Sequence, residues 1–130
     1  MAVNAHYDEV LACDWNKISP NILATGSVDK TIKIWDLRKS DRPLRTLFGH
    51  SYAITSLDWS PHSDTLLAST SYDLSCATWN TTAEKVLIER FEHHKDMVVG
   101  VSFNRNVDMQ IATCGWDGVY LFVLGSNKKF

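Results

Sequence analysis

The sequence predicts an all-β protein made of three consecutive, similar antiparallel sheets. Two observations lead to this prediction. Short segments rich in β-branched and aromatic residues alternate with turn formers, which is the pattern of strands joined by tight turns. One strand–turn–strand unit, residues 24–36, recurs at 68–80 and again at 112–124, with a spacing of 44 residues both times. We interpret this spacing as an ungapped internal repeat.

The repeat extends beyond this unit, because residues of one kind recur at the same spacing along most of the chain. The aligned sets are His6, His50 and His94; Trp15, Trp59 and Phe103; Leu23, Leu67 and Ile111; Ala24, Ala68 and Ala112; Thr25, Ser69 and Thr113; and Asp29, Asp73 and Asp117. Trp35 and Trp79 also match, whereas the third copy has Val123 at that spacing.

A period of about 40–45 residues with a His early and a Trp-Asp pair late resembles the WD40 repeat, which forms one four-stranded propeller blade. Gly49-His50 and Trp35-Asp36 stand at the expected places. The expected fold is a partial WD40 β-propeller within residues 1–130, with repeats at approximately 6–49, 50–93 and 94–124. Three blades are only part of a propeller, because closed propellers typically have about four to eight.

Each repeat supplies its predicted strands in order. The first repeat has strands at 9–15, 22–27, 31–36 and 43–48; the second at 53–59, 65–70, 74–79 and 85–91; the third at 97–103, 109–113 and 118–123. The first strand is almost continuously apolar, which predicts an inner strand packed on both faces. Pro43 suits an outer edge strand. Residues 125–130 are short and polar, so the last blade is expected to lack its outer strand.

Composition and charge argue against several classes of partner and site. The formal net charge of −2 predicts no nucleic-acid partner. Cys13, Cys76 and Cys114 lack C-x-x-C spacing, so neither a zinc site nor a disulfide framework is expected. His93 and His94 are adjacent on one segment and point to opposite sides, which disfavours a shared metal. No metal or other cofactor is predicted, and no apolar run approaches the ~18 residues of a membrane span, so direct membrane insertion is not expected.

A Ser, a His and an acid recur together and resemble a hydrolase triad. A catalytic triad has no reason to occur once per blade, so we predict that the protein is not an enzyme. The WD40 resemblance instead implies buried tetrads in which Trp donates to Ser, Ser bonds His and His bonds Asp. The predicted structural tetrads are His6, Ser27, Asp29 and Trp35, and His50, Ser71, Asp73 and Trp79.

The third repeat keeps His94 and Asp117 but has Gly115 and Val123 at the spacing of the tetrad Ser and Trp. Its network is therefore expected to be incomplete, and the third blade is expected to be looser than the others.

The residue before each tetrad Asp lies at the mouth of the central channel in a WD40 blade. Large aromatics occupy two of these places, Tyr72 and Trp116, with Glu9 and Asp96 in the neighbouring segments. Exposed aromatics beside acids are typical of a peptide-binding rim, so the candidate peptide-binding residues are Glu9, Tyr72, Asp96 and Trp116. The alternative is that the two aromatics only cap the core.

More specific segments are residues 9–15 (EVLACDW), 49–54 (GHSYAI), 67–73 (LASTSYD) and 92–96 (EHHKD). Together they resemble the C-terminal half of the peroxin-7 family, the peroxisomal import receptors for type-2 targeting signals. This resemblance implies a receptor of the cytosol and peroxisome matrix. Its partners would be cargo proteins with an N-terminal type-2 peroxisomal targeting signal, bound as an amphipathic helix, and an import co-receptor.

The alternative function is a generic WD40 scaffold for protein–protein interaction in another assembly, for example in chromatin or a ubiquitin ligase, because a fold alone does not determine function. Binding of a type-2 targeting helix to the rim distinguishes the two.

Overall fold

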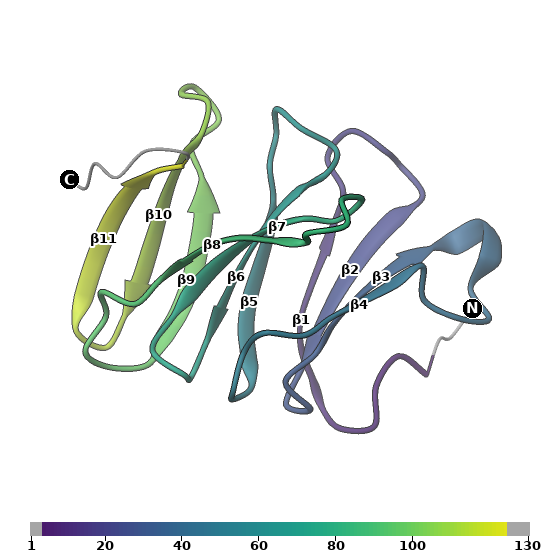
Figure 1. Ribbon diagram of the computed structural model, residues 1–130, viewed down its shortest axis with the longest axis horizontal. Coiled ribbons are helices and arrows are strands. Elements are labelled where there is room, and N and C mark those ends of the chain that lie inside the picture. The colour runs from purple at the N-terminus through teal and green to yellow at the C-terminus, as the bar shows by residue number, and fades with distance from the viewer. Residues whose placement is uncertain (1–3, 125–130) are drawn as a thin grey trace.

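The computed structural model describes residues 4–124, and these form three antiparallel sheets that lie side by side (Figure 1). Blade 1 has β1 (Val10–Trp15), β2 (Ile22–Ser27), β3 (Ile32–Asp36) and β4 (Arg45–Leu47). Blade 2 has β5 (Ile54–Trp59), β6 (Leu66–Ser71), β7 (Cys76–Asn80) and β8 (Leu87–Phe91). Blade 3 has β9 (Val98–Phe103), β10 (Gln110–Gly115) and β11 (Gly118–Val123).

Within each sheet, strands that follow one another in the chain are hydrogen-bonded neighbours. The predicted all-β class, with a partial propeller of four, four and three strands, is confirmed for the described residues. A single turn of 3-10 helix, Leu37–Lys39, follows β3. The outer strand β4 begins at Arg45, so Pro43 precedes it rather than lying within it. No helix among residues 4–124 has the length and hydropathy that a membrane span requires.

Apolar side chains pack in two layers between the blades. The layer between blades 1 and 2 contains Ala24, Ile32, Ile34, Leu47, Ile54, Leu57, Trp59, Leu67, Ala77 and Trp79. The layer between blades 2 and 3 contains Leu66, Ala68, Cys76, Phe91, Phe103, Ile111, Phe122 and Leu124. The inner strands also contact in sequence, β1 with β5 and β5 with β9. The core therefore lies between sheets, which is how alternating strand faces bury their apolar residues.

The prediction that the first strand is packed on both faces is wrong for β1. Val10, Leu11 and Trp15 are exposed, whereas the corresponding strand of blade 2 is largely buried. The reason is that only one face of blade 1 meets another sheet in the described part of the chain.

The ungapped alignment of the third repeat is also wrong, because β11 is shifted by one residue. Trp79 pairs with Leu67 in blade 2, but Ile111, which corresponds to Leu67, pairs with Phe122 rather than Val123. The cause is a shorter hairpin turn. The β6–β7 pair Thr70–Cys76 encloses five residues, 71–75, whereas the β10–β11 pair Cys114–Val119 encloses four, 115–118. Phe122 therefore occupies the place of the tetrad Trp.

The described residues end at 124, so the expectation of a polar tail without a fourth strand at 125–130 falls outside them.

Candidate interaction site

The hydrogen-bond network of blade 2 joins three strands through side chains that are almost completely buried. Trp79 Nε1 donates to Ser69 Oγ at 2.8 Å, and Ser69 Oγ lies 2.7 Å from His50 Nε2. On the other side of the imidazole ring, Nδ1 lies 2.9 Å from an Asp73 carboxylate oxygen. Because the ionised Asp73 carboxylate only accepts, Nδ1 carries the hydrogen, and in a neutral ring Nε2 then accepts the Ser69 hydroxyl hydrogen.

Blade 1 repeats this network with a threonine. Trp35 Nε1 donates to Thr25 Oγ1 at 2.9 Å, and the same hydroxyl lies 2.8 Å from His6 Nε2. His6 Nδ1 lies 2.9 Å from Asp29. The His, Asp and Trp members are therefore brought together in both blades as the sequence predicts.

The predicted serine members are wrong in both tetrads. Ser27 Oγ donates to the Glu9 carbonyl at 2.7 Å and accepts the Asp29 backbone N–H at 3.1 Å. Ser71 does the same with the carbonyl of Tyr52 and the N–H of Asp73. Alternate residues of a strand share a face, so Thr25 and Ser27 lie on the same face of β2, and the alternation alone does not decide which hydroxyl meets the ring.

The sequence contained a signal for the correct hydroxyl. Thr25, Ser69 and Thr113 supply a hydroxyl in all three repeats, whereas the third copy of Ser27 and Ser71 is Gly115.

The network of blade 3 is more complete than predicted. His94 Nε2 lies 2.8 Å from Thr113 Oγ1, and Nδ1 lies 2.6 Å from Asp117. Only the indole donor is missing, because Phe122 occupies its place and stacks on Phe91 with ring centroids 4.4 Å apart. Gly115 is required by space, since a Cβ there would lie 2.5 Å from the Met97 carbonyl oxygen.

The histidines keep the tetrad carboxyls ionised. Burial alone would raise the pKa of Asp73, but hydrogen bonds from His50 and Ser75 outweigh it and hold the pKa well below the ordinary range. The hydrogen bond from His94 likewise lowers the pKa of Asp117. The hydroxyl of each network is buried between the ring and its neighbours, so the arrangement ties strands together and presents no exposed nucleophile.

The four candidate peptide-binding residues lie on one edge of the sheets. We define this edge, the rim, as the segments before the inner strands and the three hairpin turns: residues 5–9, 49–53, 93–97, 27–31, 71–75 and 115–118. All three hairpin turns lie along the lower edge of the sheets in Figure 1. Equivalent backbone hydrogen bonds hold the turns to the segments before the inner strands. The Tyr72 N–H donates to the Ala53 carbonyl at 3.1 Å, and the Trp116 N–H donates to the Met97 carbonyl at 3.1 Å.

The aromatic side chains of the rim reach solvent. Trp116 is 69% exposed and Tyr72 is 37% exposed, which disfavours the alternative that they only cap the core. Glu9 and Asp96 are exposed as well. That these residues contact a partner stays a prediction.

Sequence reasoning missed two exposed rim tyrosines, Tyr7 and Tyr52. The ammonium of Lys33 lies 5.7 Å from the ring centroid of Tyr7, within the range of a cation–π contact. Tyr7 follows the tetrad residue His6 by one position and Tyr52 follows His50 by two, and an aromatic so close to a tetrad His was the signal that could have identified them.

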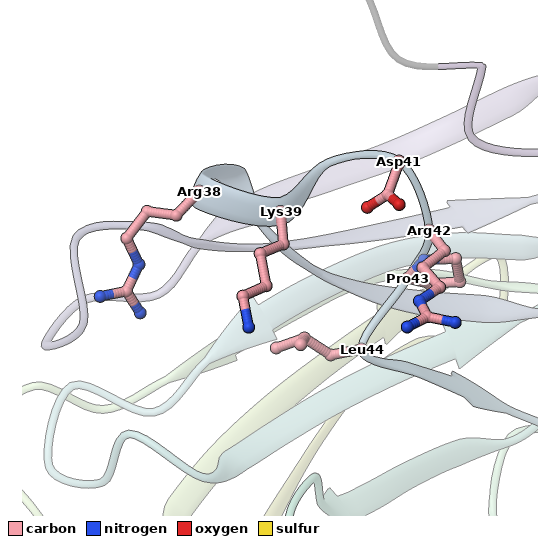
Figure 2. Close-up of a pocket in the computed structure, with 6 residues that line it drawn as sticks. All are labelled: Arg38, Lys39, Asp41, Arg42, Pro43 and Leu44. Atoms are coloured by element: carbon pink, nitrogen blue, oxygen red, sulfur yellow. The ribbon is translucent and has the colours of Figure 1, made fainter.

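A hollow lies away from the rim, formed by the 3-10 turn and the loop that leads to β4 (Figure 2). Its lining residues are Arg38, Lys39, Asp41, Arg42, Pro43 and Leu44. The Arg38 guanidinium donates to the Asp36 carboxylate at 3.0 and 2.7 Å, and these hydrogen bonds lower the pKa of Asp36 to about 2. In the part of the chain that the structure describes, no group of three or more His, Cys, Asp or Glu side chains could hold a metal ion.

Comparison with known families gives a match to the WD domain, G-beta repeat, over residues 1–36, 41–80 and 85–119. The chain is also similar to parts of individual proteins. It is 57% identical over 30 residues to the peroxisomal targeting signal 2 receptor of Saccharomyces cerevisiae, which is 23% of this chain and 8% of the receptor.

Two other relatives match longer stretches. Protein DSE1 of Candida albicans is 46% identical over 43 residues, 32% of this chain and 6% of that protein. The guanine nucleotide-binding protein subunit beta of Oryza sativa subsp. japonica is 35% identical over 54 residues, 42% of this chain and 14% of the subunit. The chain thus spans a small fraction of the length of each relative.

Proposed function

Because the chain belongs to the WD40 repeat family, whose repeats build protein-interaction domains, we propose that its rim binds peroxisomal cargo as part of a type-2 targeting-signal receptor. In this proposal the partners are cargo proteins with an N-terminal type-2 signal and an import co-receptor, and the protein acts in the cytosol and the peroxisome matrix.

The observation that carries the proposal is the chemistry of the rim. Trp116 and Tyr72 offer exposed aromatic surface, with the acids Glu9 and Asp96 on the same edge. An amphipathic helix with apolar and basic residues on one face is the complement of such a surface, because aromatics cover the apolar stripe and carboxylates meet Lys or Arg. The 30-residue similarity to the yeast receptor supports the same assignment.

The expected contributions differ between aromatic and acidic residues. Exposed ion pairs are worth about 0–1 kcal/mol each, because water and salt screen them. An aromatic anchor at the centre of an interface contributes about 2 kcal/mol or more. Trp116→Ala should therefore weaken binding more than Glu9→Gln does.

The experiment is a titration of a fluorescently labelled type-2 targeting peptide, with the co-receptor present. Ile18→Ala is the matched control, because Ile18 is an exposed apolar residue in the β1–β2 loop, at the opposite end of blade 1 from the rim. We expect Trp116→Ala to weaken binding and Ile18→Ala to leave it unchanged. Raising the salt concentration should reduce the contribution of Glu9 and leave that of Trp116 nearly unchanged.

The receptor proposal fails if the unmutated protein binds this peptide no better than a peptide whose basic residues are reversed to acids. If binding is specific but indifferent to substitution of each of the four candidate residues (Glu9, Tyr72, Asp96 and Trp116), the receptor function survives and the site assignment fails.

The second candidate is a WD40 scaffold in another assembly. The matches to the guanine nucleotide-binding protein beta subunit and to the RbAp48-related protein prw1 of Schizosaccharomyces pombe cover 42% and 38% of this chain, more than the receptor match does. Absence of targeting-peptide binding in a folded protein with an intact rim would favour this candidate.

A further inference from the structure

One interface occurs twice inside the molecule. In each case the back face of one blade covers the front face of the next. We define the front face of a blade by the residues that the preceding blade covers. They are Ile54, Leu57, Trp59, Leu67 and Trp79 in blade 2, and Val98, Val101, Phe103, Ile111 and Phe122 in blade 3. The back face of blade 1 includes Ala12, Ile22, Ala24, Ile32 and Ile34.

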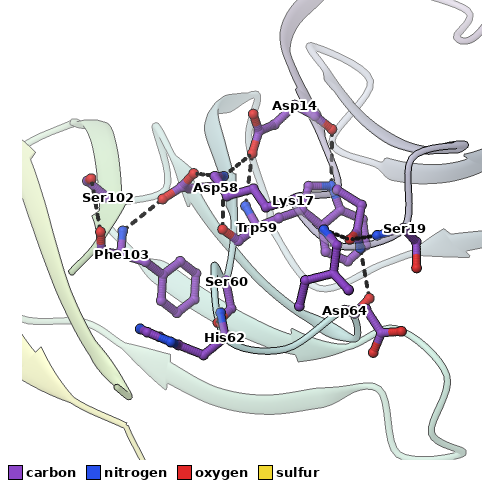
Figure 3. A network of polar contacts seen from close by, with 12 residues as sticks. Asp14, Lys17, Ser19, Asp58, Trp59, Ser60, His62, Asp64, Ser102 and Phe103 are labelled. Atoms are coloured by element: carbon purple, nitrogen blue, oxygen red, sulfur yellow. Dashed lines mark hydrogen bonds and ion pairs between the residues drawn. The ribbon is translucent and has the colours of Figure 1, made fainter. Parts of the chain in front are cut away.

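A repeated polar contact accompanies the apolar packing (Figure 3). The Asp14 carboxylate of blade 1 accepts the Trp59 backbone N–H at 2.9 Å, and the Asp14 carbonyl accepts the Trp59 indole N–H at 3.0 Å. One blade further on, Asp58 accepts the Phe103 backbone N–H at 2.7 Å. In both interfaces, the carboxylate of the penultimate residue of an inner strand thus accepts the backbone N–H of the last residue of the next inner strand.

The Lys17 side chain adds charged contacts to the first of these interfaces, between blades 1 and 2. The Lys17 ammonium lies 2.9 Å from Asp14 and also donates to the Trp59 carbonyl at 2.9 Å. It is paired with Asp58 at the same time. A basic residue in the loop after an inner strand therefore reaches the acid and the backbone of the next blade.

The front face of blade 1 has the same residue types but no blade covers it in the described structure. Val10 and Trp15 are 46% and 51% exposed, whereas their counterparts Ile54 and Trp59 are each 0% exposed. A hollow opens on this face, and its lining is largely apolar: Ala5, Val10, Cys13, Trp15, Leu23, Thr25, Trp35 and Leu37.

Blade 3 presents the complementary open face. Ala112 and Leu121 form a strand pair at the places that Ala24 and Ile34 hold in blade 1, and Leu121 is exposed. Ser102 stands at the place of Asp14 and offers a hydroxyl where the other blades offer a carboxylate. Arg105 is exposed at the place of Lys17.

We propose that the front face of blade 1 docks on the back face of blade 3 of a second copy of this chain, head to tail. The contact continues the interface that the molecule already makes twice, with Leu121 against the strands of blade 1. Arg105 is placed to meet Asp14 and the Trp15 carbonyl of the other copy, as Lys17 meets Asp58 and the Trp59 carbonyl within the chain. Such a heterologous contact forms a ring if its rotation closes and an open chain otherwise.

The test exploits the fact that the two faces differ. Trp15→Lys disables the front face and leaves the back face intact, and Leu121→Lys does the reverse. Both side chains are exposed, so each variant is expected to fold, which circular dichroism checks. Trp116→Lys is the matched control, because it replaces an exposed Trp on the rim, away from both faces.

Sedimentation over a range of concentrations measures association of the full chain. We expect the unmutated chain and Trp116→Lys to associate, and each face variant alone to associate at least about tenfold more weakly. A mixture of the two face variants should recover a one-to-one complex, because one intact front meets one intact back. Ser102→Asp should tighten association several-fold, whereas Ser102→Asn should do so less.

Three results would overturn the proposal. The unmutated chain could stay monomeric up to about 100 µM. Leu121→Lys could associate as well as the unmutated chain, which would mean that front faces adhere to one another. The mixture of face variants could remain monomeric while both variants are folded. The binding of targeting peptides does not enter any of these readings, so the outcome is independent of the proposed function.

Discussion

Trp79→Phe probes the blade 2 network at its best-defined bond. The substitution keeps an aromatic ring in a fully buried place but removes the N–H that donates to Ser69 at 2.8 Å. A lost hydrogen bond between neutral groups costs about 0.5–1.5 kcal/mol. The smaller ring also leaves a void in the apolar layer between blades 1 and 2, which adds about 1–2 kcal/mol. We expect a total loss of about 1.5–3.5 kcal/mol in the free energy of unfolding.

A double-mutant cycle separates the hydrogen bond from the void. The void is present in Trp79→Phe whichever hydroxyl accepts the bond, so only the coupling energy reports the partner. Combined with Ser69→Ala, Trp79→Phe should show a coupling of about 0.5–1.5 kcal/mol. Combined with Ser71→Ala, the coupling should be close to zero, because Ser71 bonds the Tyr52 carbonyl and the Asp73 N–H instead.

Urea unfolding followed by far-ultraviolet circular dichroism is the assay, at protein concentrations low enough to suppress association. Ser71→Ala on its own is expected to be destabilising, so single substitutions do not discriminate between the two serines. Coupling to Ser71 rather than to Ser69 would refute our assignment of the tetrad hydroxyl.

Three further predictions follow from other contacts. Gly115→Ser places in blade 3 the serine that blade 2 has at Ser71. It should lower the free energy of unfolding by about 1–3 kcal/mol, because its Cβ would crowd the Met97 carbonyl. Urea unfolding measures this loss, and an unchanged free energy would contradict the prediction. The folded-state pKa of Asp73 lies below the ordinary value of 3.8, so its contribution to stability is present above pH 3.8 and is lost as the pH falls through the lowered value. Asp73→Asn should therefore destabilise the protein at neutral pH and weaken the dependence of stability on pH below 3.8; an unchanged acid profile would count against the network. Asp58→Ala should speed hydrogen exchange of the Phe103 amide, because the amide loses its acceptor at 2.7 Å. Unchanged protection would contradict a stabilising role for this hydrogen bond between the blades.

The sequence by itself determined the class of fold and the position of its strands. The segments 22–27 and 118–123 were predicted with the boundaries that β2 and β11 have. This succeeded because the β-branched and aromatic pattern and the turn formers act locally, and because the internal repeat presents each of the first three strands of a blade three times. The His, Asp and Trp members of the tetrads in blades 1 and 2 were implied by the resemblance of this repeat to the WD40 repeat.

The tertiary structure alone decided how the strands pair and which faces remain open. A turn that is one residue shorter shifts every later side chain of a strand by one place, so Phe122 replaces Val123 in the blade 3 layer although the sequence spacing points to Val123. Thr25 and Ser27 share one face of a strand, and the pairing of β2 with β3 brings the Thr25 hydroxyl, rather than that of Ser27, to Trp35. Trp15 and Trp59 are identical in kind and aligned in the repeat, yet one is half exposed and the other fully buried, because burial depends on whether a neighbouring sheet covers the face.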